Sequence, residues 1–166
     1  MLVSNLYRIG WFVGLVLIQV LVLNNIHLFG VATPLLYIYL LLKFESGTSR
    51  NGMMLWAFLL GFVVDVFSDT MGMNIIASVM LAFCQPTFLM LFVPRDMVDN
   101  IVPSAKSMGF LPFFKYVTIC VLVHHTTLFM VEFFSFAHLG LLLLRIITSS
   151  LLTIACIMAI EGVKKE

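Results

Sequence analysis

An uncharged run near the start of the chain limits what this protein can fold into. No Asp, Glu, Lys or Arg occurs between Arg8 and Lys43. A helix rises about 1.5 Å per residue and the hydrocarbon core of a bilayer is about 30 Å thick, so a single helix of this length would overshoot a membrane. The run therefore has to fold back on itself, and we expect the turn at the polar and glycine-containing residues 24–30.

The composition indicates whether this uncharged run lies in water or in a lipid bilayer. Hydrophobic residues make up 62% of the 166 positions and charged residues 10%, whereas soluble domains have roughly 45–50% and about 25%. A water-soluble fold could not cover this much apolar surface with polar groups, so the sequence predicts an integral membrane protein. The net charge of +1 excludes the concentrated basic face that nucleic acids require.

Polar segments divide the chain into six apolar spans. We therefore expect a single all-α domain over residues 1–166, a bundle of six transmembrane helices. The segment 94–112 contains three prolines and four charged residues and is expected to be a loop. The helices are expected at about 9–24, 31–44, 53–68, 74–93, 113–135 and 139–160.

The basic residues indicate how this bundle is oriented. In a six-span arrangement every lysine and arginine except Arg145 falls on one side of the membrane. Because cytoplasmic loops are enriched in Lys and Arg, both termini and the loop 94–112 are expected in the cytoplasm.

Four charged residues fall within the outer half of the predicted bundle: Asp65, Asp69, Glu132 and Arg145. A charge inside a membrane is costly and needs a partner or a function. The first candidate for an ion pair is Glu132 with Arg145, on consecutive antiparallel helices, and the second is Asp65 with Arg145. We interpret the cluster as a buried clamp that fixes helix register, in preference to a ligand or proton site.

Two other pairs of residues stand out. His124 and His125 are adjacent, so only one is expected to point inward, as a hydrogen-bonded core histidine rather than a proton relay. Gly10 and Gly14 form a small-xxx-small pair that permits close approach of another helix, either in a partner chain or within this one. No GxSxG, HExxH or P-loop motif occurs, so we expect no enzyme, catalytic residues, cofactor or metal site.

One stretch of about two dozen residues, 60–83, resembles the signature region of MreD, the rod shape-determining membrane protein family. The matching residues are Gly61, Asp65, Gly72 and Asn74, in the pattern G-x3-D-x6-G-x-N. Chain length and the expected spans agree as well, and the Phe- and Met-rich composition looks closest to MreD proteins of Bacteroidetes-like bacteria. In this motif we expect Asn74 to cap the following helix and Gly72 to permit the turn.

The resemblance implies a multi-pass protein of the bacterial inner (plasma) membrane. Its fold would be similar to that of the S-components of energy-coupling-factor transporters. Its function would be that of a non-catalytic scaffold of the elongasome, which maintains rod cell shape by organising lateral peptidoglycan synthesis. The expected direct partner is a bitopic MreC-like protein, with MreB, RodA and a class B penicillin-binding protein reached indirectly. We hypothesise that Asp65 locks the outer half of the bundle into a groove for a partner's single transmembrane helix.

Two alternatives remain open. An S-component would bind a small molecule in its outer half, although the outward loops are short and no polar or aromatic ligand cluster stands out there. An ion or proton carrier would use Asp65, Glu132 and Arg145, although the chain has no detectable internal repeat.

Overall fold

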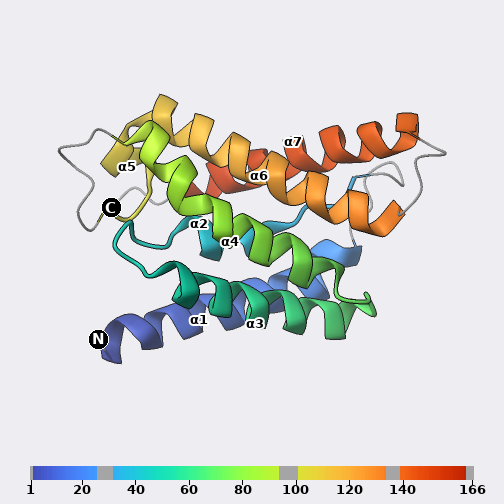
Figure 1. Ribbon diagram of the computed structural model, residues 1–166, viewed down its shortest axis with the longest axis horizontal. Helices are drawn as coiled ribbons and strands as arrows, with labels where there is room; N and C mark the ends of the chain where they lie inside the picture. The colour runs from blue at the N-terminus through green and yellow to red at the C-terminus, as the bar shows by residue number, and fades with distance from the viewer. Residues whose placement is uncertain (1, 26–31, 94–100, 134–138, 164–166) are drawn as a thin grey trace.

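A computed structural model describes residues 2–25, 32–93, 101–133 and 139–163, and all regular secondary structure in these ranges is helical. Five helices are long and four segments are short (Figure 1). The long helices are α1 (Leu2–Leu21), α3 (Arg50–Ser68), α4 (Met73–Phe92), α6 (Phe110–Phe133) and α7 (Leu139–Val163). The short segments are η1 (Leu23–Asn25), η2 (Leu36–Ile38), α2 (Tyr39–Leu42) and α5 (Ala105–Met108).

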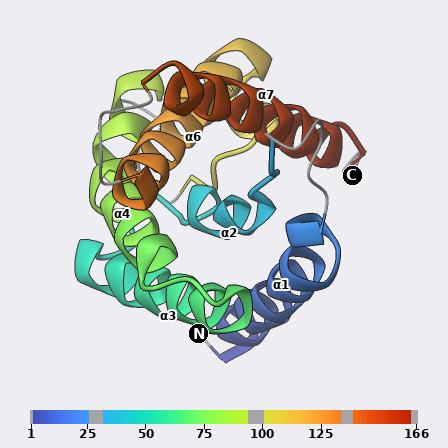
Figure 2. The same cartoon turned by 90° about the vertical axis from the view of Figure 1, so that its right-hand side faces the viewer.

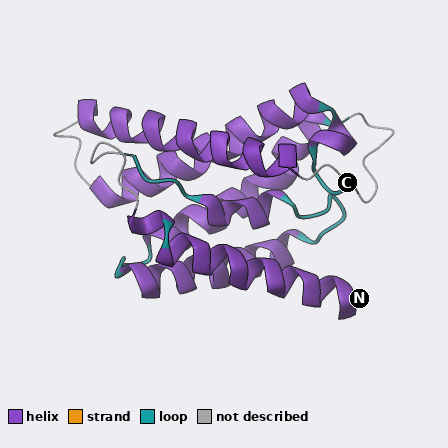
Figure 3. Cartoon of the chain, turned by 180° about the vertical axis from the view of Figure 1, so that it is seen from behind, coloured by secondary structure: helices purple, strands orange, loops and turns teal. Residues whose placement is uncertain are grey.

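The long helices form a ring around a short central segment. Viewed along the bundle, α1, α3, α4, α6 and α7 surround α2 (Figure 2). Seen from behind, the long helices run side by side along one axis (Figure 3). Helix α1 begins and α7 ends at the same end of the bundle, whereas the turn between α3 and α4 lies at the opposite end (Figure 1).

The described helices suit a membrane. Helices α3, α4, α6 and α7 are each long and apolar enough to cross one. All four expose large apolar side chains, as lipid-facing surfaces do; Phe62 and Met90, for example, are 48% and 63% exposed. The described part of the chain is thus all-helical, with four helices able to span a bilayer, and the expected count of six spans is not confirmed.

The transmembrane helix expected at 31–44 does not form over the described residues 32–44. Only the seven residues of η2 and α2 (three and four) are helical in that range, a length of about 12 Å that cannot cross a bilayer. Residues 33–35 are not in a helix. Every residue from 34 to 42 is buried, because the ring of long helices encloses this segment.

Side chains satisfy the irregular backbone of this central segment. Gln19 of α1 is fully buried; its Oε1 accepts a hydrogen bond from the Leu36 amide at 2.8 Å, and its Nε2 donates to the Pro34 carbonyl at 2.9 Å. The Thr153 hydroxyl of α7 accepts from the Leu35 amide at 3.0 Å. Non-helical backbone at membrane depth is tolerated only where such partners exist inside the protein. The sequence analysis missed Gln19, although a lone glutamine in an apolar helix is a recognisable signal.

The other helix and loop boundaries differ less from those expected from the sequence. Helix α1 begins at Leu2 rather than at residue 9, and the loop 94–112 includes the short helix α5 and the first residues of α6. Residues 94–100 of that loop lie outside the described residues.

Ion pairs hold the end of the bundle where α1 begins, which we call the basic end after Arg8, Lys43, Arg50 and Lys106. There the Lys43 ammonium lies 2.8 Å from Glu161 of α7 and donates to the Pro103 carbonyl at 2.7 Å. Arg8 of α1 pairs with Glu45 at 3.2 Å. These contacts tie the loop before α5 and the end of α7 to the central segment.

Gly61 provides a test of the packing between α3 and α4. A Cβ atom at Gly61 would lie 2.6 Å from the Ile75 Cα, closer than real contacts allow, whereas one at Gly14 would meet no atom within 4 Å. Gly61→Ala should therefore destabilise the protein by about 1–3 kcal/mol, the usual cost of overpacking. Thermal unfolding in detergent measures this, with Gly14→Ala as the matched control. Equal midpoints for the two variants would contradict the close approach of the two helices.

Candidate functional site

The Asp65 carboxylate joins α3 to α4. Asp65 lies in the last turn of α3 and is 4% exposed. Its Oδ1 accepts hydrogen bonds from the Asn74 amide at 3.1 Å, the Asn74 Nδ2 at 2.9 Å and the Thr70 hydroxyl. Its Oδ2 accepts from the Ile75 amide at 3.0 Å. The carboxylate thus occupies the N-terminus of α4, where free amides and the helix dipole favour a negative charge.

The turn between the two helices requires left-handed backbone at two positions. Asp69 directly follows α3 and has φ of 53°, and Gly72 directly precedes α4 and has φ of 78°. Glycine adopts such a conformation without steric cost. Gly72 therefore permits the turn, and the turn places Asn74 beside Asp65.

The expectation that Asn74 caps the start of α4 is wrong. Gly72 occupies the N-cap position, and Asn74 lies within the first turn of the helix. The Asn74 side chain instead donates to Asp65 and accepts from the Tyr37 hydroxyl at 2.8 Å. Asn74 therefore connects the central segment to the contact between Asp65 and the start of α4, which we call the α3–α4 joint. The cap of α4 itself comes from Asp65.

A directional chain of hydrogen bonds extends from this joint into the core. The Tyr37 hydroxyl donates its one hydrogen bond to the Asn74 Oδ1. The His124 Nε2, at 2.9 Å, therefore donates to the Tyr37 oxygen. His124, Tyr37, Asn74 and Asp65 thus form one chain that ends on a carboxylate. It links α6, η2, α4 and α3.

Glu132 and Arg145 form the second polar feature of this end. The Arg145 Nη1 donates to the Glu132 Oε1 at 3.0 Å, which is the first of the two expected pairings. The Arg145 side chain is 31% exposed and that of Glu132 is 35% exposed, so the pair borders open space. Asp65 is bound in the α3–α4 joint instead of pairing with Arg145.

The four expected cluster residues are therefore divided among three places. Asp65 is buried in the α3–α4 joint, Asp69 is exposed at the turn, and Glu132 and Arg145 pair across α6 and α7. Asp69 does not continue the helical face of Asp65, because α3 ends at Ser68 and Asp69 has left-handed backbone.

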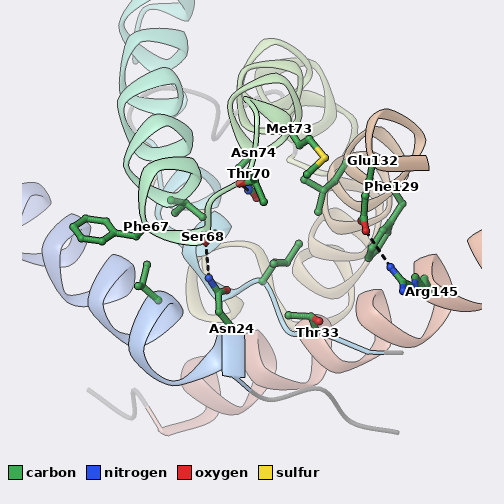
Figure 4. A pocket seen from close by; sticks show the side chains of 14 residues that line it. Asn24, Thr33, Phe67, Ser68, Thr70, Met73, Asn74, Phe129, Glu132 and Arg145 are labelled. Carbon is green, nitrogen blue, oxygen red and sulfur yellow. Dashed lines mark hydrogen bonds and ion pairs between the residues drawn. The ribbon is translucent and has the colours of Figure 1, made fainter. Parts of the chain in front are cut away.

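A cavity of about 480 Å³ separates the joint from the ion pair. Figure 4 shows Asn24 and Ser68 on one side of it and Glu132 and Arg145 on the other. The Asn24 Nδ2 donates to the Ser68 Oγ at 2.6 Å. The polar lining consists of Asn24, Thr33, Ser68, Thr70, Asn74, Glu132 and Arg145. No polar cluster stands out in the sequence, because these residues come from five separated segments of the chain; the fold brings them together.

Both adjacent histidines are buried, contrary to the expectation that only one points inward. His124 contacts Tyr37, whereas the His125 Nδ1 lies 2.9 Å from the Val121 carbonyl and its Nε2 lies 3.2 Å from the Thr153 hydroxyl. Both histidine side chains can be buried because α6 faces the central segment on one side and α7 on the other. Among the residues that the structure describes, no three His, Cys, Asp or Glu side chains are grouped to bind a metal.

Gly10 and Gly14 have open space beside them. A Cβ atom at either position would meet no atom within 4 Å in the described structure. The close internal packing that such a pair permits is therefore not used here.

Neither a protein-family model, nor a curated protein, nor a solved structure matches this chain.

The two neighbouring aspartates give a test of the joint. Asp65→Asn replaces one acceptor oxygen with an amide that faces hydrogen-bond donors, and each charge-assisted bond lost costs about 1.5–3 kcal/mol. We expect a clearly lower unfolding midpoint than for Asp69→Asn, which changes an exposed side chain at a left-handed position that asparagine tolerates. Differential scanning fluorimetry in detergent makes the comparison. A variant at Asp65 as stable as the one at Asp69 would show that the carboxylate does not hold the joint.

Proposed function

We propose that this protein is an MreD-type scaffold of the bacterial elongasome, without catalytic activity of its own. The observation that carries the proposal is that all four residues of the resemblance have structural roles where α3 meets α4. Gly61 allows α3 to approach α4, Asp65 caps α4, Gly72 permits the turn, and Asn74 binds both Asp65 and Tyr37. Each of the four residues thus has a structural role of its own, which supports the resemblance.

The joint supports a scaffold because it makes one end of the bundle rigid. Its buried hydrogen bonds have strong geometric preferences and link three helices and the central segment. A rigid helical surface loses little conformational entropy when another polypeptide binds.

The proposed partner is a bitopic MreC-like protein. We place its single transmembrane helix on α1 rather than in the groove expected near Asp65, because the hollow at that end is lined by polar and charged residues. On α1, Gly10 and Gly14 leave a shallow notch beside the exposed side chains of Val13 and Leu17. Small residues let two helix backbones approach closely in a membrane, where van der Waals packing drives association. MreB, RodA and a class B penicillin-binding protein would be reached through that partner.

The proposed location is the bacterial inner membrane, with both termini in the cytoplasm. The described basic residues support this orientation, because Arg8, Lys43, Arg50 and Lys106 share one end of the bundle. Arg145 lies toward the other end.

The cavity favours a second candidate, a small-molecule-binding S-component. Its volume of about 480 Å³ falls within the range of roughly 300–1,000 Å³ typical of ligand pockets. A water-soluble metabolite retained through purification would favour this candidate over the scaffold.

Depletion in the native host tests the proposed function. Loss of the protein should convert rod-shaped cells to spheres, because lateral wall synthesis loses its organisation. Phase-contrast microscopy measures the ratio of cell length to width, and re-expression of the wild-type protein is the control. Cells that stay rod-shaped after complete depletion would contradict the proposal.

Affinity purification tests the partner surface. Leucines at Gly10 and Gly14 would fill the notch on α1, so Gly10→Leu with Gly14→Leu should reduce co-purification of the bitopic partner about tenfold, equivalent to roughly 1.4 kcal/mol. Gly140→Leu is the matched control, since position 140 also has open space around it but lies on α7. Undiminished recovery with the double variant, if it folds normally, would exclude this face of α1.

A further inference from the structure

The cavity presents a negative and a positive group side by side on one wall. Glu132 and Arg145 lie 3.0 Å apart and about one third of each side chain is exposed. The opposite wall is neutral and offers the Asn24 amide, the Ser68 hydroxyl and the Thr70 hydroxyl. A ligand suited to this wall carries both a cationic donor and an anionic acceptor.

The ion pair does not use all of its hydrogen-bonding atoms. Among the described residues, Arg145 donates only through Nη1, to Glu132, although about one third of its side chain is exposed. A guanidinium carries five N–H donors in a planar fork, so donors on its Nη atoms remain for a ligand. Glu132 accepts through Oε1, which leaves Oε2 to receive another donor.

Apolar side chains also line the cavity. Val64 of α3 and Leu128 and Phe129 of α6 do so together with Val20 and Leu35. A bound molecule therefore meets apolar side chains as well as the charged pair. Such a surface suits a polar head joined to an apolar body.

The depth of the ion pair matches the polar boundary of a bilayer. Arg145 lies six residues after the start of α7, about 9 Å along the helix. The polar region adds roughly 5–7 Å to each side of the hydrocarbon core, so Arg145 lies near this boundary. Glu132 lies one residue before the end of α6, at a similar level.

We propose that this cavity binds a zwitterionic head group with a primary ammonium and a phosphate diester. The phosphate accepts from the Nη atoms of Arg145, and the ammonium donates to the Glu132 Oε2. Two sources carry this chemistry: a membrane phospholipid with an ethanolamine head group, and soluble glycerophosphoethanolamine. This site is separate from the α1 surface proposed for the protein partner.

Binding to the full-length protein in detergent tests the proposal. Delipidated protein is titrated with dioleoyl phospholipids that carry ethanolamine, choline or glycerol head groups, and bound lipid is counted by native mass spectrometry. The ethanolamine lipid should bind at least about tenfold more tightly, because choline has no N–H to donate and glycerol has no cation. Glycerophosphoethanolamine is added as competitor: competition shows that the head group suffices, and its absence shows that the lipid body is also needed.

Variants of the ion pair provide the control. Arg145→Lys keeps a cation near Glu132 but removes the planar set of guanidinium donors, and Glu132→Gln removes the anionic acceptor. Either should weaken binding of the ethanolamine lipid about tenfold or more. Arg8→Lys, in the ion pair at the basic end, should leave it unchanged. Equal affinity for the three lipids, no binding of any, or no effect of Arg145→Lys would overturn the proposal. Co-purification of a partner through α1 is independent of each of these results.

Discussion

The architecture of one end of the bundle depends on a single buried carboxylate. Asp65 receives four hydrogen bonds from three residues at the start of α4 and in the turn before it. In a membrane the free amides of a helix start have no water to satisfy them, so an internal acceptor is needed. Because that acceptor belongs to α3, capping α4 also fixes how the two helices meet. Gly61 and Gly72 follow from this constraint, since they allow the close packing and the turn.

The central segment also needs internal hydrogen-bond partners for its backbone. Its non-helical part would leave amides and carbonyls unsatisfied, and side chains of the surrounding helices bind them instead, Gln19 above all. The enclosed segment then brings Tyr37 to Asn74 and so connects the core to the Asp65 joint. The remaining space at that end is the cavity, with the joint on one side and the Glu132–Arg145 pair on the other.

Much of the helical pattern could be predicted because long apolar spans and polar turns are local signals. The segment containing η2 and α2 could not, since it is as apolar as a spanning helix and only its enclosure by five helices shows that it does not cross. The pairing of Glu132 with Arg145 followed from their matching depth on consecutive helices. The capping of α4 by Asp65 did not, because two of its four hydrogen bonds come from backbone amides, which leave no trace in the side-chain sequence. The polar cavity was missed for a related reason: its lining comes from separated segments, each with only one or a few polar residues.

Hydrogen exchange at the start of α4 tests the central claim most directly. If the Asp65 carboxylate holds the amides of Asn74 and Ile75, both should exchange slowly in the wild-type protein. In Asp65→Ala both should exchange much faster, while amides in the middle of α3 and α4 keep their protection. Peptide-level mass spectrometry across residues 70–80 in detergent can measure this. Equally fast exchange of these two amides in the wild type and in Asp65→Ala would contradict the account.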